Sequence, residues 1–171
     1  MIEDIEVRKI KQNFNKTKID NLSEYVHQSF KKSDLKNRIK LGDKIGITVG
    51  SRGITNIKLI VKEVISELKN LNASPFILPA MGSHGGANSE GQKDVLASYG
   101  ITQKEMGVPI MASMDVVQIG IVENEIPVYF SKIAMEADGI IALNRVKMHT
   151  DFKSNIVESG MSKILVIGLG K

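Results

Sequence analysis

The amino-acid sequence predicts one α/β domain over residues 1–171, built on a mostly parallel sheet. Two apolar runs, at residues 44–49 and 76–78, have the length and composition of buried strands. Between them, apolar side chains recur along one stripe at helical spacing. A strand, a helix and a second strand in this order are typical of a parallel pair joined by a right-handed crossover.

The other elements of the first half follow from local patterns. Residues 4–14 alternate apolar and charged side chains, which predicts an edge strand. Asp20 is placed to cap a helix that runs to about Lys32, in which His27 has a structural role, and Thr55 is expected to begin the next helix. The inner side of the first helix would comprise Leu22, Tyr25, Val26, Ser29 and Phe30. The stripe of the second comprises Ile57, Ile60, Val61, Val64, Leu68 and Leu71.

The second half continues the alternation of helices and strands. The predicted elements are a helix at 90–99 ended by Gly100, a capped turn at 102–105, strands at 116–122 and 127–130 joined as a hairpin, helical turns at 132–137, and buried strands at 139–143 and 164–167. A polar loop, residues 144–160, separates the last two strands.

Composition limits the possible compartments and partners. The chain has no cysteine, which excludes disulfides, thiolate metal sites and a cysteine nucleophile. No stretch approaches the roughly 20 apolar residues of a membrane span, and the first residues lack the features of a signal peptide. We therefore expect a cytoplasmic protein with no membrane partner. The net charge of +4 is spread over many lysines without an RNA-binding aromatic motif, which favours a solvated basic surface over nucleic-acid binding.

A glycine turn at residues 50–53 follows the first buried strand and leads into a helix. Backbone N–H groups at such a helix start attract anions, and the guanidinium of Arg52, beside Ser51, adds a forked donor. The Gly-Lys-Ser/Thr ending of an ATP-binding loop is missing. An anion site and a tight turn with a surface arginine are both open at this point.

His84 follows the second buried strand, in a glycine-rich run that includes Gly82 and Ser83. Imidazole gives and takes protons near neutral pH, and flanking glycines let a ligand approach the backbone closely. This setting favours a functional histidine over a structural one.

The third candidate loop contains His149, which Asp151 is placed to orient. Asn144, Arg145 and Lys147 would add polar and cationic groups for a phosphate or carboxylate, and Lys163 leads into an apolar run. Partial desolvation there would make its amine nucleophilic, and plain solvation is the alternative. No histidine pair has metal-binding spacing, so we expect no metal site within the chain. Because the carboxyl ends of parallel strands meet at one edge, His84 and His149 are expected to form an acid/base pair there.

The order of these loops resembles the N-terminal domain of the nickel-dependent lactate racemase family. The similarity runs from about Lys44 to the C-terminus and rests on Arg52 after one strand, the run 82–84 after the next, and His149 followed by Lys163. It implies a Rossmann-like, three-layer α/β domain, followed in a longer two-domain protein by a domain that closes over the site. It also implies a nickel pincer nucleotide, a pyridinium derivative tethered to a lysine, whose nickel-binding histidine would lie beyond Lys171.

The resemblance assigns roles by position in this sequence. His84 and His149 would be the catalytic proton carriers while a hydride moves between the substrate and the cofactor. The cofactor-binding residues would be Lys163 as the tether, Arg52, Ser51, Gly82 and Ser83. The substrate would be a small 2-hydroxy acid and the full protein a racemase or epimerase, whereas this chain alone is expected to be inactive.

Two alternatives stay open beside this function. The chain would be a non-catalytic nucleotide- or phosphate-binding module if Arg52, Arg145 and Lys147 surround a phosphate. It would be an assembly domain, and a homo-oligomer, if its last strand pairs with another copy.

Overall fold

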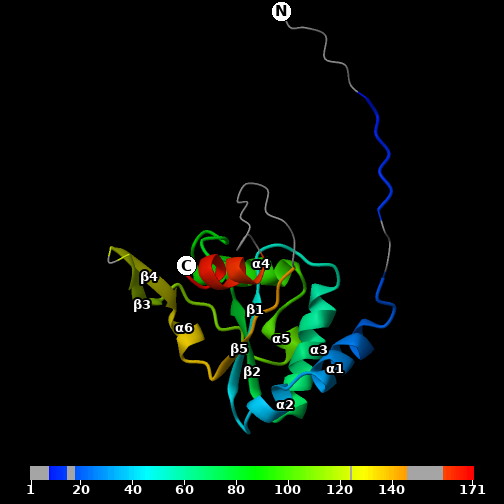
Figure 1. Ribbon diagram of the computed structural model, residues 1–171, viewed down its shortest axis with the longest axis horizontal. Coiled ribbons are helices and arrows are strands. Elements are labelled where there is room, and N and C mark those ends of the chain that lie inside the picture. Colours follow the sequence, from blue (N-terminus) through cyan, green and yellow to red (C-terminus); the bar gives the residue numbers. More distant parts are fainter. Residues whose placement is uncertain (1–7, 15–17, 124, 146–159) are drawn as a thin grey trace, which may run out of the picture.

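The computed structural model describes residues 8–14, 18–123, 125–145 and 160–171. A three-stranded parallel sheet lies at its centre, in the order β2-β1-β5 (Figure 1). Its strands are β1 (Lys44–Val49), β2 (Ser74–Pro79) and β5 (Gly139–Ile141). Because β1 runs parallel to both neighbours, all three strands end at the same edge of the sheet. The predicted α/β fold is therefore confirmed.

One face of the sheet is covered by helices from the first half of the chain. These are α1 (Leu22–Lys32), the short α2 (Leu35–Arg38) and α3 (Ile57–Asn70), which lie together on one side in Figure 1. The apolar stripe of α3 is buried against β1 and β2, as its spacing predicts, through Val61, Val64 and Leu68. The helix begins at Ile57 and not at Thr55, because Asn56 adopts a left-handed conformation with a φ of 61°.

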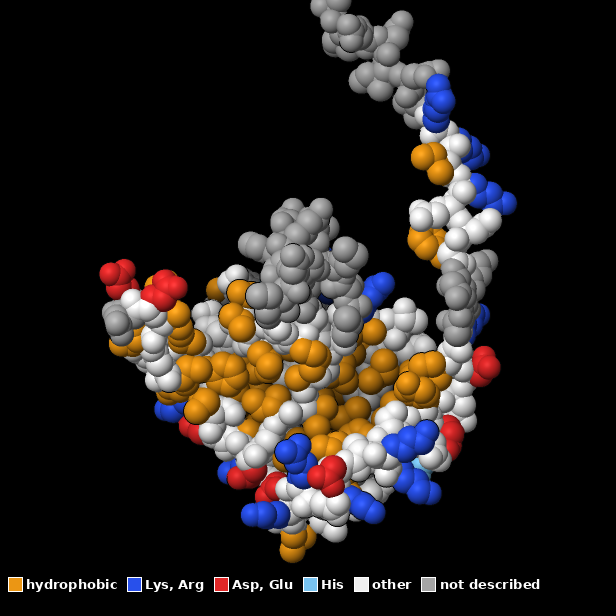
Figure 2. Space-filling view, in the orientation of Figure 1, with side chains coloured by type: hydrophobic (Ala, Val, Ile, Leu, Met, Phe, Trp, Pro, Cys, Tyr) orange, Lys and Arg blue, Asp and Glu red, His pale blue; other side chains and the backbone are white. Residues whose placement is uncertain are grey.

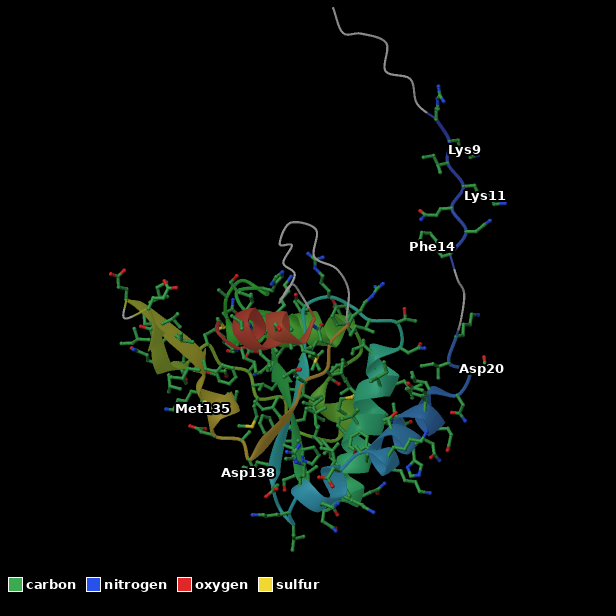
Figure 3. All side chains as sticks on the ribbon, viewed as in Figure 1. Lys9, Lys11, Phe14, Asp20, Met135 and Asp138 are labelled. Atoms are coloured by element: carbon green, nitrogen blue, oxygen red, sulfur yellow. The ribbon has the colours of Figure 1, made fainter. Side chains whose placement is uncertain are left out.

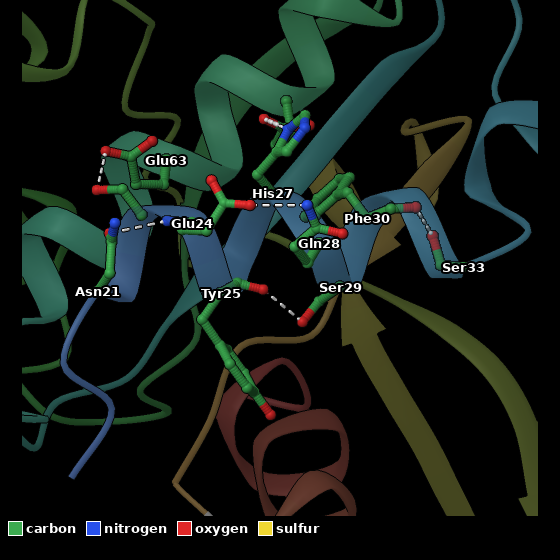
Figure 4. Close-up of polar contacts among 11 residues, drawn as sticks. Asn21, Glu24, Tyr25, His27, Gln28, Ser29, Phe30, Ser33 and Glu63 are labelled. Atoms are coloured by element: carbon green, nitrogen blue, oxygen red, sulfur yellow. Dashed lines mark hydrogen bonds and ion pairs between the residues drawn. The ribbon is translucent and has the colours of Figure 1, made fainter.

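Polar contacts fix α1 on α3 (Figure 4). Asn21, and not Asp20, caps α1, since its side-chain oxygen accepts from the Glu24 backbone N–H at 3.1 Å. Ser23 donates to Glu63 at 2.8 Å, and His27 Nδ1 lies 3.0 Å from Glu67 Oε1, so the structural role of His27 is confirmed. Only Val26 of α1 is fully buried; the expected inner positions Tyr25 and Ser29 are exposed, because the polar contacts with α3 turn them away.

The other face of the sheet carries α6 (Lys132–Met135) and the C-terminal helix, which consists of α7 (Met161–Lys163) and a π-helical stretch (Ile164–Gly168). Phe76 and Leu78 of β2 pack there against Ala134, Ile164 and Leu169. The prediction of a final strand at 164–167 is wrong. A short apolar run does not distinguish strand from helix, and here Ile164 and Gly168 are buried while the three residues between them are exposed, which is a one-sided helical pattern.

The remaining elements agree with their sequence patterns. Helices α4 (Ser89–Ser98) and α5 (Gln103–Met106) begin at the side-chain caps Asn88 and Thr102. Gly100 follows α4 with a φ of +73°, as expected of a helix-ending glycine. Strands β3 (Val116–Val122) and β4 (Ile126–Ser131) form the predicted antiparallel hairpin. The strand predicted at 139–143 is shorter in the structure and half-buried.

The predicted edge strand at 4–14 is wrong for the part of it that the structure describes. Residues 8–14 have no regular structure, and Figure 3 shows Lys9, Lys11 and Phe14 on a segment that extends away from the body. A segment with alternating apolar and charged side chains forms a strand only where a neighbouring strand pairs with it. No strand of the described residues pairs with residues 8–14. Among the described residues, no helix has the length and apolar character needed to cross a membrane.

The packing of the core predicts that two leucines of α3 contribute differently to the free energy of unfolding. Leu68 is completely buried between the helix and the sheet, whereas Leu59 is 39% exposed. Leu68→Ala should lower the free energy of unfolding by about 2–5 kcal/mol, since it removes buried methyl groups and leaves a cavity. Leu59→Ala should cost less than about 1 kcal/mol. Urea unfolding followed by circular dichroism measures both, and equal losses would contradict the packing described.

Candidate functional site

A cleft of about 210 Å³ opens at the carboxyl ends of β1 and β2. Its apolar floor includes Val49, Ala80 and Ile164. The polar residues that line it come from several loops and are Ser51, Arg52, His84, Asn144, Arg145 and Lys163. Two arginines and a lysine give this lining positive charge, and no carboxylate is among the described residues that form it. Such a cleft favours an anionic ligand.

The loop that carries Arg52 is held from the end of α4. The hydroxyl of Tyr99 donates to the Ser51 carbonyl at 2.6 Å. Its ring lies 3.4 Å from the point where a Cβ of Gly53 would stand, so the aromatic side and the hydroxyl both support the turn. Arg52 itself is exposed at the cleft and forms no ion pair with any described carboxylate.

The His84 loop folds back on its own backbone. His84 Nδ1 lies 2.9 Å from the Met81 carbonyl oxygen. A carbonyl can only accept, so the neutral imidazole carries its proton on Nδ1 and leaves Nε2 with a lone pair. Nε2 is therefore the atom able to accept a proton from a ligand in the cleft.

Glycines bring this loop against α4 and the C-terminal helix. Gly82 has a φ of +56° and donates to the Gly168 carbonyl at 3.1 Å. A Cβ on Gly168 would stand 2.6 Å from the Ala80 carbonyl oxygen, so the π-helical stretch touches the end of β2 backbone to backbone. This close approach places Lys163, one residue before the stretch, on the wall of the cleft.

Side chains also hold the segment that follows β5. Thr48, completely buried in β1, accepts from the Leu143 backbone N–H at 2.9 Å and so prolongs the β1–β5 contact beyond Ile141. Asn144 donates from Nδ2 to the Gly160 carbonyl at 2.5 Å and accepts from the Arg145 backbone N–H at 2.9 Å. The start of the C-terminal helix is thereby fixed beside the end of β5.

Comparison with known proteins identifies the family. The chain matches the family model of the lactate racemase N-terminal domain over residues 2–169. It belongs to this family. No curated protein and no solved structure gave a significant match. The resemblance drawn from the loops is confirmed, and the match extends it from Lys44 almost to the N-terminus.

In this lactate racemase N-terminal domain, the cleft brings together Arg52, Ser51, His84 and Lys163, as the sequence predicts. Gly82 and Ser83 do not line it; Gly82 is buried beneath the loop, where its contribution is the close backbone contact. His149, with Lys147 and Asp151, lies outside the described residues. Within the described residues, no group of histidine and carboxylate side chains could hold a metal ion.

Sequence reasoning did not find the residues that hold the loops. Gln92 belongs to α4 and Tyr99 follows its last residue, and the weak apolar pattern of this helix concealed which side chains face inward. Gln92 is buried and donates to the Gly82 carbonyl at 2.8 Å. A polar residue on the inner side of a helix, directly after a glycine loop, is the signal that could have revealed it.

Two glycines allow a test of how tightly the His84 loop is packed. Gly91, in α4, has no room for a side chain, because a Cβ would stand 1.9 Å from the Gly85 carbonyl oxygen. Glycine to alanine within a helix usually stabilises by about 0.5–1 kcal/mol. Gly91→Ala should instead lower the urea midpoint, since the Gly85 backbone must move.

Gly120, in β3, is the matched control, because a Cβ there meets nothing within 4 Å. Gly120→Ala should leave the midpoint unchanged or raise it. A higher midpoint for Gly91→Ala would show that the loop does not pack on α4 as described.

Proposed function

We propose that the chain is the cofactor-binding part of a 2-hydroxy acid racemase or epimerase and that it holds a nickel pincer nucleotide through Lys163. Membership of the lactate racemase family supports the reaction class. The observation that carries the proposal is the meeting of an amine, an imidazole and a guanidinium at one cleft. The absence of cysteine is consistent with a cytoplasmic protein.

The residues of the cleft fit such a group. Lys163 presents the amine for a covalent tether at the cleft wall, and Arg52 and Arg145 supply charge for its phosphate. No described carboxylate repels an anion there. In this proposal the described residues hold the group through Lys163 and the two arginines, and the nickel-binding histidine that the family resemblance implies would lie beyond Lys171. When bound, that group supplies the acceptor for the hydride of the substrate.

His84 would act on the hydroxyl group of the substrate. Its Nε2 takes the hydroxyl proton as the C–H bond at the α-carbon breaks, and returns it when that bond forms again. A racemase acts on both enantiomers, so a second proton carrier is needed for the enantiomer of opposite configuration. His149 is our candidate, by its position in the family resemblance, and it lies outside the described residues.

The tether predicts a covalent change at one lysine. Protein produced in cells that make the cofactor should carry the added mass of the nucleotide, and Lys163→Ala should abolish that mass, because no other amine lines the described cleft. Lys62→Ala, at an exposed position of α3, is the control and should keep it. Intact-protein mass spectrometry makes the measurement.

In full-length protein, His84→Gln should keep the added mass and lower kcat by about 10²–10⁴-fold, the range for loss of a general acid or base. An adduct that survives Lys163→Ala, or none on the wild type, would refute the tether.

A phosphate-binding module without chemistry is the second candidate, and the cationic lining, which has no carboxylate among the described residues, favours it. Calorimetric titration with pyrophosphate separates the two. Binding that needs Arg52, with no adduct under any condition and no racemisation by full-length protein, would establish this module in place of the racemase.

A further inference from the structure

Gln92 is completely buried in α4, behind the His84 loop. A buried amide costs free energy unless its donor and acceptor are both satisfied, so its partners are informative. Its Nε2 donates to the Gly82 carbonyl at 2.8 Å, and its Oε1 accepts from Lys171 Nζ at 3.3 Å. The amide therefore connects the loop to the segment that follows the C-terminal helix.

Lys171 determines which way this amide points. An ammonium group can only donate, so it can bond only to Oε1, and Nε2 is left to face Gly82. The same ammonium donates to the Ser113 carbonyl. Burial lowers the pKa of the Lys171 amine, and the nearby Asp115 carboxylate opposes that shift.

The carbonyl that Gln92 holds is next to the one that orients His84. Gly82 is bound at its carbonyl by Gln92 and at its N–H by Gly168, and the preceding carbonyl, that of Met81, accepts from His84 Nδ1. A Cβ on Gly82 would stand 2.8 Å from the Ile167 carbonyl oxygen, which leaves this peptide little room to turn. Without the Gln92 bond, the Gly82 carbonyl would be buried with no partner in this arrangement, and the loop would have to move to satisfy it.

We propose that Gln92 is a positioning residue for His84. Its amide, oriented by Lys171, holds the loop so that the imidazole keeps its proton on Nδ1 and offers the bare Nε2 to the cleft. The catalytic meaning of this tautomer rests on the proposed function, whereas the tautomer itself does not.

The test is ¹⁵N NMR of the histidine side chains in full-length protein, with the His84 signals assigned by their loss in His84→Gln. Wild-type protein should show a protonated Nδ1 and a bare Nε2. Gln92→Met keeps the length of the side chain but removes the donor, so the protonated fraction at Nδ1 should fall. In the loaded enzyme, kcat should fall about 10- to 100-fold with KM and the added mass unchanged, as expected when a reacting group is misplaced.

Two controls separate positioning from general destabilisation. Val64→Ala removes buried methyl groups of α3, in the same core as Met81, without removing a bond to the loop, and Gln28→Met makes the same substitution in α1, where Gln28 bonds Glu24. Both should keep the wild-type tautomer. An unchanged tautomer in Gln92→Met, or the same change in Val64→Ala, would overturn the proposal.

If Gln92→Met does not fold, substitutions of Lys171 provide the test. Lys171→Met should reduce the Nδ1-protonated fraction and Lys171→Arg should preserve it; equal tautomers in the two would overturn the proposal. Because the NMR result needs no cofactor, it stands even if the wild type carries no adduct. Failure of the proposed function is therefore distinguishable from failure of this inference.

Discussion

The parallel pairing of β1 with both of its neighbours is the constraint on which the site depends. It makes β1, β2 and β5 end at one edge, so that the loops after them begin side by side although they are far apart in sequence. The buried hydroxyl of Thr48 adds to this pairing, because it bonds Leu143 after the strand contact with β5 has ended. An antiparallel β5 would deliver Asn144 and Arg145 to the opposite end of the sheet.

Pairing alone places the loops near one another, and side-chain bonds to backbone carbonyls then fix their shape. Tyr99 bonds Ser51, Gln92 bonds Gly82, and Asn144 bonds Gly160. Gln92 lies in α4 and Tyr99 directly after it, outside the loops they hold, whereas Asn144 joins the two ends of its own loop. Without these donors, the loop carbonyls would have to accept hydrogen bonds from water. A cleft wall held in that way is less rigid than one held by the protein. Donors anchored on the scaffold let irregular backbone form a defined wall.

Much of this arrangement could be predicted from the sequence, and the failures have definite causes. The β1–α3–β2 unit was predictable because its apolar spacing is local and strong, and glycine-rich turns after the strands located Arg52 and His84. The C-terminal helix was not, because residues 164–167 are apolar in a run too short to show a period. The segment 8–14 alternates like a strand, but alternation does not show whether a pairing edge exists. Gln92 was missed because its partners lie 10 and 79 positions away along the chain.

The positive charge of the cleft lining affects the stability of the fold. Arg52 and Arg145 line the same cleft, and like charges repel one another, although exposure to water weakens the effect. A ligand with negative charge removes that repulsion and exchanges water for fixed donors, so it would bind the folded state in preference to the unfolded chain. Any such ligand stabilises the domain by mass action, in proportion to its affinity. A lining with this charge would therefore make the free domain less stable than the same domain with an anion bound.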